Sequence, residues 1–274
     1  MGKLDGKVAF ITGAARGQGR SHAVRLAGEG ADIIAVDICA QIESVPYAMA
    51  TEADLAETVS QVEALDRRIV SAVADVRDAA ALRKVVDEGV AQLGSVDIVL
   101  ANAGIFGVSA RPDVDQDALF AEVIDINLTG VWNTVSAAAP AMIEQGRGGS
   151  IVITSSAAGL SGRGGDGSGA FTGYQAAKHG VVGLMRSFSH WLAPHNIRVN
   201  SVHPTGVNTD MIVNSNMEEY RELNPSMSET LSNLLPIPVV EPIDISNAVA
   251  WLVSDEARYV TGVTLPVDAG FLIK

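Results

Sequence analysis

The stretch KVAFITGAARGQG, residues 7–19, decides the fold. The uncharged run 8–12 predicts a buried strand, and the apolar spacing beyond Gly19 predicts a helix. Glycines between a strand and a helix let the main chain approach a pyrophosphate, which the free amides and the helix dipole then hold. We therefore predict a dinucleotide site rather than a plain tight turn. Its candidate residues in this loop are Gly13, Arg16, Gly17, Gln18 and Gly19.

Short β-branched runs recur along the whole chain and predict about seven strands. They lie at 7–12, 32–37, 69–76, 96–104, 150–156, 197–204 and 263–268. Helical segments lie between them, and one begins with a capping box formed by Thr51 and Asp54. Continuous apolar strands that alternate with helices are typical of a parallel sheet covered on both faces. The sequence predicts an α/β fold with a doubly wound parallel sheet, in a single domain over residues 1–274.

Charge and composition exclude several classes of protein. A net charge of -13 argues against binding to nucleic acid. The single cysteine, Cys39, excludes an intramolecular disulfide, and the histidines show no ligand spacing, so we expect no metal site. Charges at Lys3, Asp5 and Lys7 do not suit a secretory signal, which predicts a cytoplasmic protein. The longest uncharged stretch, 126–143, is too polar to span a membrane.

Polar residues follow the predicted strands at the edge where parallel sheets bind ligands. Asp37 ends the second strand, where a carboxylate accepts hydrogen bonds from the adenosine ribose of NAD and repels the extra phosphate of NADP. Because Arg16 and Arg20 lie nearby, NADP is an alternative cofactor. A second alternative is that Asp37 is only a loop acid or a helix cap. The candidate cofactor contacts at these strand ends are Asp37, Ile38, Asp75, Val76, Asn102, Ala103 and Gly104.

Tyr174 and Lys178 lie four residues apart, on one face of a predicted helix. Lowering a tyrosine pKa by about three units requires about 4 kcal/mol, roughly what an ammonium at about 4 Å supplies at an effective dielectric of 20. Tyr174 is then able to take a proton from an alcohol. Ser156, at the end of the fifth strand, is placed to hydrogen-bond the substrate oxygen. Asn127 places an amide inside a helix. The alternative is that Tyr174 and Lys178 are an ordinary exposed pair of side chains on a helix.

The combined pattern resembles the classical short-chain dehydrogenase/reductase family over essentially the whole chain. It consists of Thr12-Gly13-x3-Gly17-x-Gly19, Asn102-Ala103-Gly104, Asn127, Ser156 and Tyr174-x3-Lys178. The resemblance implies a Rossmann-type sheet, a homotetramer and a catalytic tetrad of Asn127, Ser156, Tyr174 and Lys178. It also implies that Asn127 holds a water in a proton relay and that Lys178 binds the nicotinamide ribose. Tyr174, Val207 and Thr209 are its other cofactor contacts, Val207 meeting the carboxamide through its backbone.

Two features point to one group within this family. Segment 38–59 lengthens the connection between the second and third strands, and the gap between Ser156 and Tyr174 is long. Both look like the carveol dehydrogenase group, which is associated with the redox carrier mycofactocin and in which NAD is thought not to exchange freely. The alternative is that 39–50 is only a surface loop. After the sixth strand, Pro204-Thr205-Gly206 departs from the family's usual Pro-Gly pair.

Two segments are predicted to surround the substrate. Seven of the seventeen residues between Ser156 and Tyr174 are glycine, which suits a loop that returns to one active site, with residues 163–172 in the pocket wall. Segment 210–242 predicts a mobile apolar lid or, alternatively, an oligomer contact. Its apolar residues include Met211, Met217, Met227, Leu231, Leu234 and Leu235.

We expect NAD-dependent interconversion of a secondary alcohol and its ketone, with a small apolar cyclic substrate such as the terpene alcohol carveol. A 3-oxoacyl or polyketide-type ketoreductase is the alternative within enzymes, and a non-catalytic NAD-binding protein is the alternative outside them.

Overall fold

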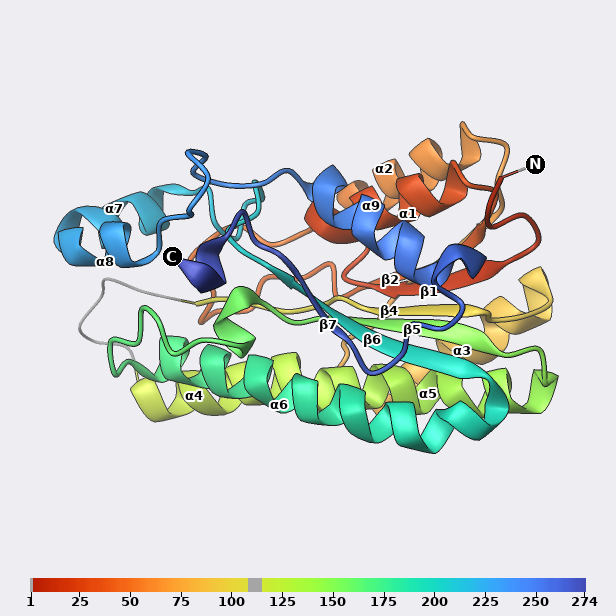
Figure 1. The fold of residues 1–274 in the computed structure, drawn as a ribbon. Coiled ribbons are helices and arrows are strands. Elements are labelled where there is room, and N and C mark those ends of the chain that lie inside the picture. The colour runs from red at the N-terminus through yellow and green to blue at the C-terminus, as the bar shows by residue number, and fades with distance from the viewer. Residues whose placement is uncertain (1, 108–114) are drawn as a thin grey trace.

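The computed structural model describes residues 2–107 and 115–274, except for the side chains of residues 227–228. Seven strands form one parallel sheet in the order β3-β2-β1-β4-β5-β6-β7 (Figure 1). Their bounds are β1 Val8–Thr12, β2 Asp32–Asp37, β3 Ile69–Val73, β4 Ile98–Ala101, β5 Gly149–Thr154, β6 Ile197–Pro204 and β7 Thr264–Val267. The predicted doubly wound, Rossmann-type sheet is confirmed. Its third, fourth and fifth strands end two or three residues earlier than expected, so Asp75, Asn102 and Ser156 lie in loops.

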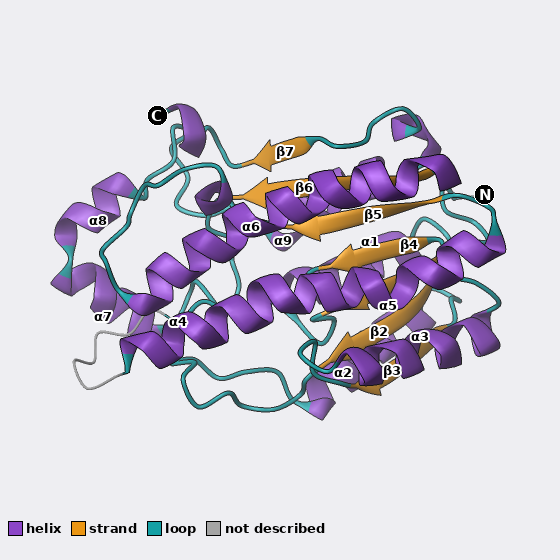
Figure 2. Cartoon of the chain, turned by 90° about the horizontal axis from the view of Figure 1, so that it is seen from below, coloured by secondary structure: helices purple, strands orange, loops and turns teal. Residues whose placement is uncertain are grey.

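Helices cover both faces of the sheet. One face carries α1 Gly17–Ala27, α2 Glu52–Glu63 and α9 Pro242–Val253 (Figure 1). The other carries α3 Ala79–Leu93, α4 Gln116–Ile124, α5 Gly130–Gln145 and α6 Gly169–Leu192, seen from below in Figure 2. Thr51 and Asp54 form the predicted capping box at the start of α2. Within the described ranges, no helix is long and apolar enough to cross a membrane.

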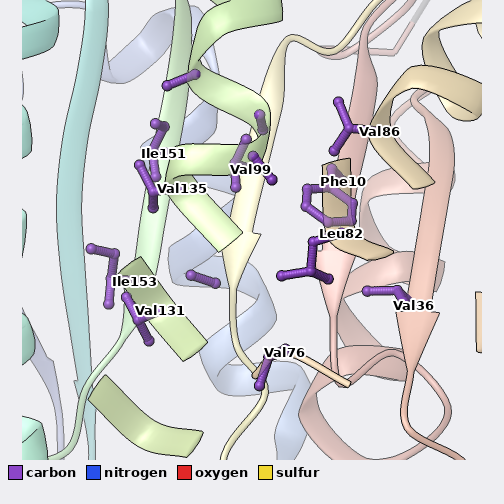
Figure 3. Packing of buried hydrophobic residues seen from close by; sticks show 14 of the residues in the cluster. Phe10, Val36, Val76, Leu82, Val86, Val99, Val131, Val135, Ile151 and Ile153 are labelled. Atoms are coloured by element: carbon purple, nitrogen blue, oxygen red, sulfur yellow. The ribbon is translucent and has the colours of Figure 1, made fainter. Parts of the chain in front are cut away.

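The buried side chains form one layer on each face of the sheet. Along β1, Phe10 packs below the sheet with Leu82 of α3, whereas Ile11 packs above it with Leu26 of α1. Figure 3 shows the lower layer, in which side chains of α3 and α5 meet those of the strands. Full burial of each such side chain contributes about 1.5–3 kcal/mol. Both faces of β1 are therefore fixed, which holds the loop that follows it.

The carboxyl ends of all seven strands share one edge of the sheet. Two short helices, α7 Ser215–Leu223 and α8 Pro225–Thr230, lie beyond this edge, near the C-terminus (Figures 1 and 2). The turns after β1, β2, β4 and β5 open onto the same side. The fold thereby gathers segments that lie far apart in the sequence.

Candidate active site

The loop after β1 requires glycine at two positions. Gly13 has a φ of +69°, and a Cβ there would lie 2.9 Å from the Cα of Ala103. A Cβ on Gly19 would lie 1.9 Å from the carbonyl oxygen of Gly13. No side chain fits at either position, so the loop packs its main chain directly against α1 and the end of β4.

This loop borders a cavity of about 150 Å³ at the carboxyl edge of β1, β2 and β4. Most of the predicted cofactor residues lie on its walls. They are Gly13, Arg16, Gly17, Gln18, Gly19, Asp37, Ile38, Asp75, Val76, Asn102, Ala103, Gly104 and Thr209. The predicted residues thus come together from five separate segments.

Asp37 and Asp75 keep their carboxylates in place through local hydrogen bonds. Asp37 accepts from the backbone N–H groups of Ala15, at 3.0 Å, and Cys39, at 3.2 Å. A carboxylate has about four acceptor positions, so Asp37 retains capacity for ribose hydroxyls. Burial opposes the charge of Asp75, but hydrogen bonds from Arg77 prevail and lower its pKa. The carboxylate of Asp75 is therefore already hydrogen-bonded to Arg77.

The long connection after β2 forms part of the same cavity. Ile42, Tyr47 and Met49 line it. Burial raises the pKa of Tyr47 to about 12, and its hydroxyl accepts from the backbone N–H of Phe106. The alternative that segment 39–50 is only a surface loop is wrong, because these side chains form a wall of the cavity.

A second cavity, of about 180 Å³, adjoins the first. Ser156, Tyr174, Lys178 and Val207 line it, and the remaining wall is mostly apolar. The two cavities share five wall residues, namely Gln18, Asn102, Gly104, Thr209 and Met211. They therefore form one continuous site with a glycine-lined half and an apolar half.

Ser156, Tyr174 and Lys178 lie on the wall of the apolar half. Ser156 caps a short 3₁₀ turn, Ala157–Gly159, by accepting from the backbone N–H of Ala158, and its side chain also acts to lower the pKa of Tyr174. Tyr174 lies in the second turn of α6, because the helix begins at Gly169. The Nζ of Lys178 donates to the carbonyl of Thr154 at 2.8 Å.

Burial dominates the electrostatics of this group. It raises the pKa of Tyr174, although the hydrogen bond with Ser156 acts in the opposite direction. It also lowers the pKa of Lys178 to about 8. The Nζ of Lys178 lies 5.5 Å from the centre of the Tyr174 ring, and burial prevails in the protein alone. That the ammonium depresses the tyrosine pKa stays a prediction.

Asn127 lies behind this group and not on either cavity wall. It is fully buried within a π-helical turn, Asp125–Thr129, and its amide exchanges two 2.8 Å hydrogen bonds with the backbone of Ile105. A Cβ on Gly104 would lie 2.9 Å from its Oδ1 and 3.7 Å from the Nζ of Lys178. Asn127 thus shapes the turn after β4, and its role in a proton relay stays a prediction.

The apolar half draws on both segments predicted to surround it. Arg163 and Phe171 of the glycine-rich gap line it, with Met211, Met217 and Leu231. Leu234 and Leu235 are exposed and lie outside the wall, and the side chain of Met227 falls outside the described residues. The mobility of this lid stays a prediction.

Sequence reasoning missed two of the residues that line the apolar half. Phe106 and Phe271 line it, although neither belongs to a motif. His203, one of the histidines without ligand spacing, is fully buried behind Ser156. An aromatic residue just beyond a strand end is the only sequence signal that Phe106 and Phe271 share.

The glycine-lined half fits a dinucleotide. The Oε1 of Gln18 is buried with no hydrogen-bond partner among the described residues, and Gln18 lines both halves. A buried amide oxygen without a partner is costly unless a ligand supplies a donor. Beside it, the main chain at Gly13 leaves no room for a side chain. These features suit NAD at the junction.

Comparison with known proteins agrees with this geometry. The family model for short chain dehydrogenase matches residues 7–220. An uncharacterized oxidoreductase of Mycobacterium tuberculosis is 58% identical, over 99% of this chain and 98% of that protein. The (-)-trans-carveol dehydrogenase of Rhodococcus erythropolis is 49% identical, over the full length of both. The crystal structure of carveol dehydrogenase from Mycobacterium avium in complex with NAD superimposes with a TM-score of 0.91, at 53% identity and full coverage of both chains.

The chain belongs to the short-chain dehydrogenase family. The predicted likeness to the carveol dehydrogenase group within it is also confirmed.

Proposed function

We propose that the protein interconverts a secondary alcohol and its ketone with NAD. One observation carries this proposal: Ser156, Tyr174 and Lys178 line an apolar cavity that shares wall residues with a glycine-lined one. The glycine loop would hold the pyrophosphate, Asp37 the adenosine ribose, and Tyr174, Lys178 and the backbone of Val207 the nicotinamide end.

The chain's own residues would handle the proton. Ser156 would hydrogen-bond the alcohol oxygen, and Tyr174, as phenolate, would accept the hydroxyl proton as the ketone forms. Bound NAD supplies the acceptor for the hydride. Tyr174 needs nearby positive charge to ionise near neutral pH, and Lys178, with a pKa of about 8, is the chain's own source of it.

A small cyclic alcohol without charged groups, such as carveol, fits the apolar half. Its wall contains Phe106, Phe171, Met217 and Phe271, whose rings and thioether offer no strong hydrogen bonds. The likeness to two carveol dehydrogenases supports the same substrate class.

We further propose that NAD is held tightly and passes its electrons to an external carrier such as mycofactocin. Ile42, Tyr47 and Met49 form one wall of the glycine-lined cavity. An ion pair of 2.8 Å between Arg16 and Asp210 joins the glycine loop to the segment after β6. Native mass spectrometry of the purified protein tests this idea, since NAD should survive exhaustive dialysis. Complete loss of NAD on dialysis would contradict it.

The experiment for the reaction is oxidation of a panel of cyclic alcohols with a dye as electron acceptor. Tyr174→Phe should lower kcat by about 10²- to 10⁴-fold, because a general base contributes about that much. NAD binding should stay within about twofold of the unmodified protein. Tyr259→Phe, at an exposed ring, is the matched control. Retained turnover in Tyr174→Phe, or turnover of 3-oxoacyl thioesters alone, would overturn the proposal.

A further inference from the structure

His203 is a buried imidazole at the end of β6, directly behind the turn that carries Ser156. Its Nδ1 lies 2.9 Å from the carbonyl oxygen of Ser156, and its Nε2 lies 2.8 Å from the Oγ of Ser201. A carbonyl oxygen only accepts, so Nδ1 carries the proton and Nε2 accepts from the Ser201 hydroxyl. The three residues therefore form a hydrogen-bonded chain with one direction and one tautomer.

The ring remains neutral in this setting. Burial lowers the pKa of His203 to about 4. The hydrogen bond to Ser156 opposes this shift, whereas the positive groups of Lys178 and His179 add to it. Because the neutral ring has one donor and one acceptor, both of its hydrogen bonds are satisfied across the physiological range of pH.

The main chain of β6 cannot donate this hydrogen bond to the Ser156 carbonyl. The β5–β6 ladder ends where the N–H of Ser155 donates to the carbonyl of Val202 at 2.9 Å. The residue after His203 on β6 is Pro204, which has no N–H to offer. The side chain of His203 thus extends the link between the two strands beyond their last main-chain hydrogen bond, to Ser156.

We propose that His203 is a positioning residue, which fixes the main chain of Ser156 so that its hydroxyl meets Tyr174 and the substrate oxygen. This inference rests on the proposed function. His203 transfers no proton in the reaction, because it touches Ser156 only through a carbonyl, which has no proton to pass on. Its effect would reach Tyr174 through the side chain of Ser156, which acts to lower the pKa of the tyrosine.

Two substitutions at position 203 separate positioning from packing. His203→Leu fills the space but leaves the Ser156 carbonyl without its donor, and should lower kcat about 30- to 100-fold, since a misplacement of about 1 Å can cost about 100-fold. His203→Asn places an amide N–H near the position of Nδ1 and should restore kcat to within about threefold. NAD affinity should stay within about twofold in both. Equal losses in the two variants would overturn the proposal.

A double-mutant cycle with Ser156→Ala shows whether the effect passes through Ser156. His203→Leu should change kcat by less than about threefold in the Ser156→Ala background. In the protein that keeps Ser156, His203→Leu should also move the pH midpoint of alcohol oxidation to higher pH, because Tyr174 loses an interaction with Ser156 that lowers its pKa. The same factor in both backgrounds would assign His203 a merely structural role.

The tautomer can be measured without any turnover, which separates this inference from the proposed function. NMR of protein with ¹⁵N-labelled histidine, assigned by comparison with His203→Asn, should show the Nδ1–H form of His203 at pH 7. Observation of the Nε2–H form would overturn the hydrogen-bonded chain. If the unmodified protein oxidised no alcohol but showed the Nδ1–H form, only the proposed function would fail.

Discussion

Asp37 has two tasks at the tip of β2. It holds the glycine loop through the backbone N–H of Ala15, which is fully buried, and it faces the cavity proposed for the adenosine ribose. Removing the whole carboxyl group would leave that N–H without a partner, at a cost of about 1–3 kcal/mol. A useful substitution must remove the charge and keep an oxygen.

We expect Asp37→Asn to raise the affinity for NADP relative to NAD by about tenfold, because it removes one charge that repels the 2′-phosphate while the amide oxygen, turned to the place of Oδ2, accepts from Ala15. Calorimetric titration of protein freed of cofactor gives both dissociation constants. Asp54→Asn, an acid at the start of α2 outside the cavity, is the control. An unchanged ratio would show that Asp37 does not select the cofactor.

At the scale of single residues, the sequence predicted what local motifs encode. Gly13, Asp37 and Tyr174 lie in motifs whose spacing fixes their place at a strand end or on a helix. The function of His203 depends on the register of β5 against β6, which no local pattern reveals. The rise in the pKa of Tyr174 was also missed, because it depends on burial by residues from other parts of the chain.

At the scale of elements, Arg163 ties together three segments around the apolar half. Its guanidinium donates to the carbonyls of Phe271 and Thr230 and lies 4.4 Å from the centre of the Phe271 ring. Its own carbonyl accepts from the side chain of Gln175 on α6 at 2.9 Å. The glycine-rich loop, the end of α8 and the C-terminal turn are thus joined at one residue. The sequence predicted the loop and the lid but not this connection, because its partners are main-chain carbonyls.

We expect Arg163→Met to change which alcohols are accepted before it changes cofactor affinity. Methionine keeps much of the apolar length but loses the hydrogen bonds, so the pocket wall loosens. The ratio of kcat/KM between large and small cyclic alcohols should shift by about tenfold, roughly the effect of about 1.4 kcal/mol, while NAD affinity stays within about twofold. Lys84→Met, which removes only a surface ion pair with Glu88, is the control. An unchanged substrate ranking would exclude Arg163 from specificity.

At the scale of the whole molecule, two apolar faces lie on opposite sides of the sheet. On α5 and α6, Trp132 and Trp191 are 49% and 45% exposed, and Phe188 packs between them. On α9, Ile243 and Trp251 are also exposed. Figure 1 shows α9 above the sheet and α5 and α6 below it. A tetramer with twofold symmetry needs two different self-complementary interfaces, and we propose that these faces provide them.

This arrangement predicts a stepwise loss of assembly. Trp132→Ser with Trp191→Ser should leave dimers, because the α9 face still pairs, and Ile243→Ser with Trp251→Ser should leave the other kind of dimer. All four substitutions together should give monomers. Light scattering after size-exclusion chromatography gives the masses, with Leu223→Ser on α7 as an exposed apolar control. Tetramers in either double variant would show that the substituted face is not an interface, whereas monomers of the unmodified chain would contradict the tetramer itself.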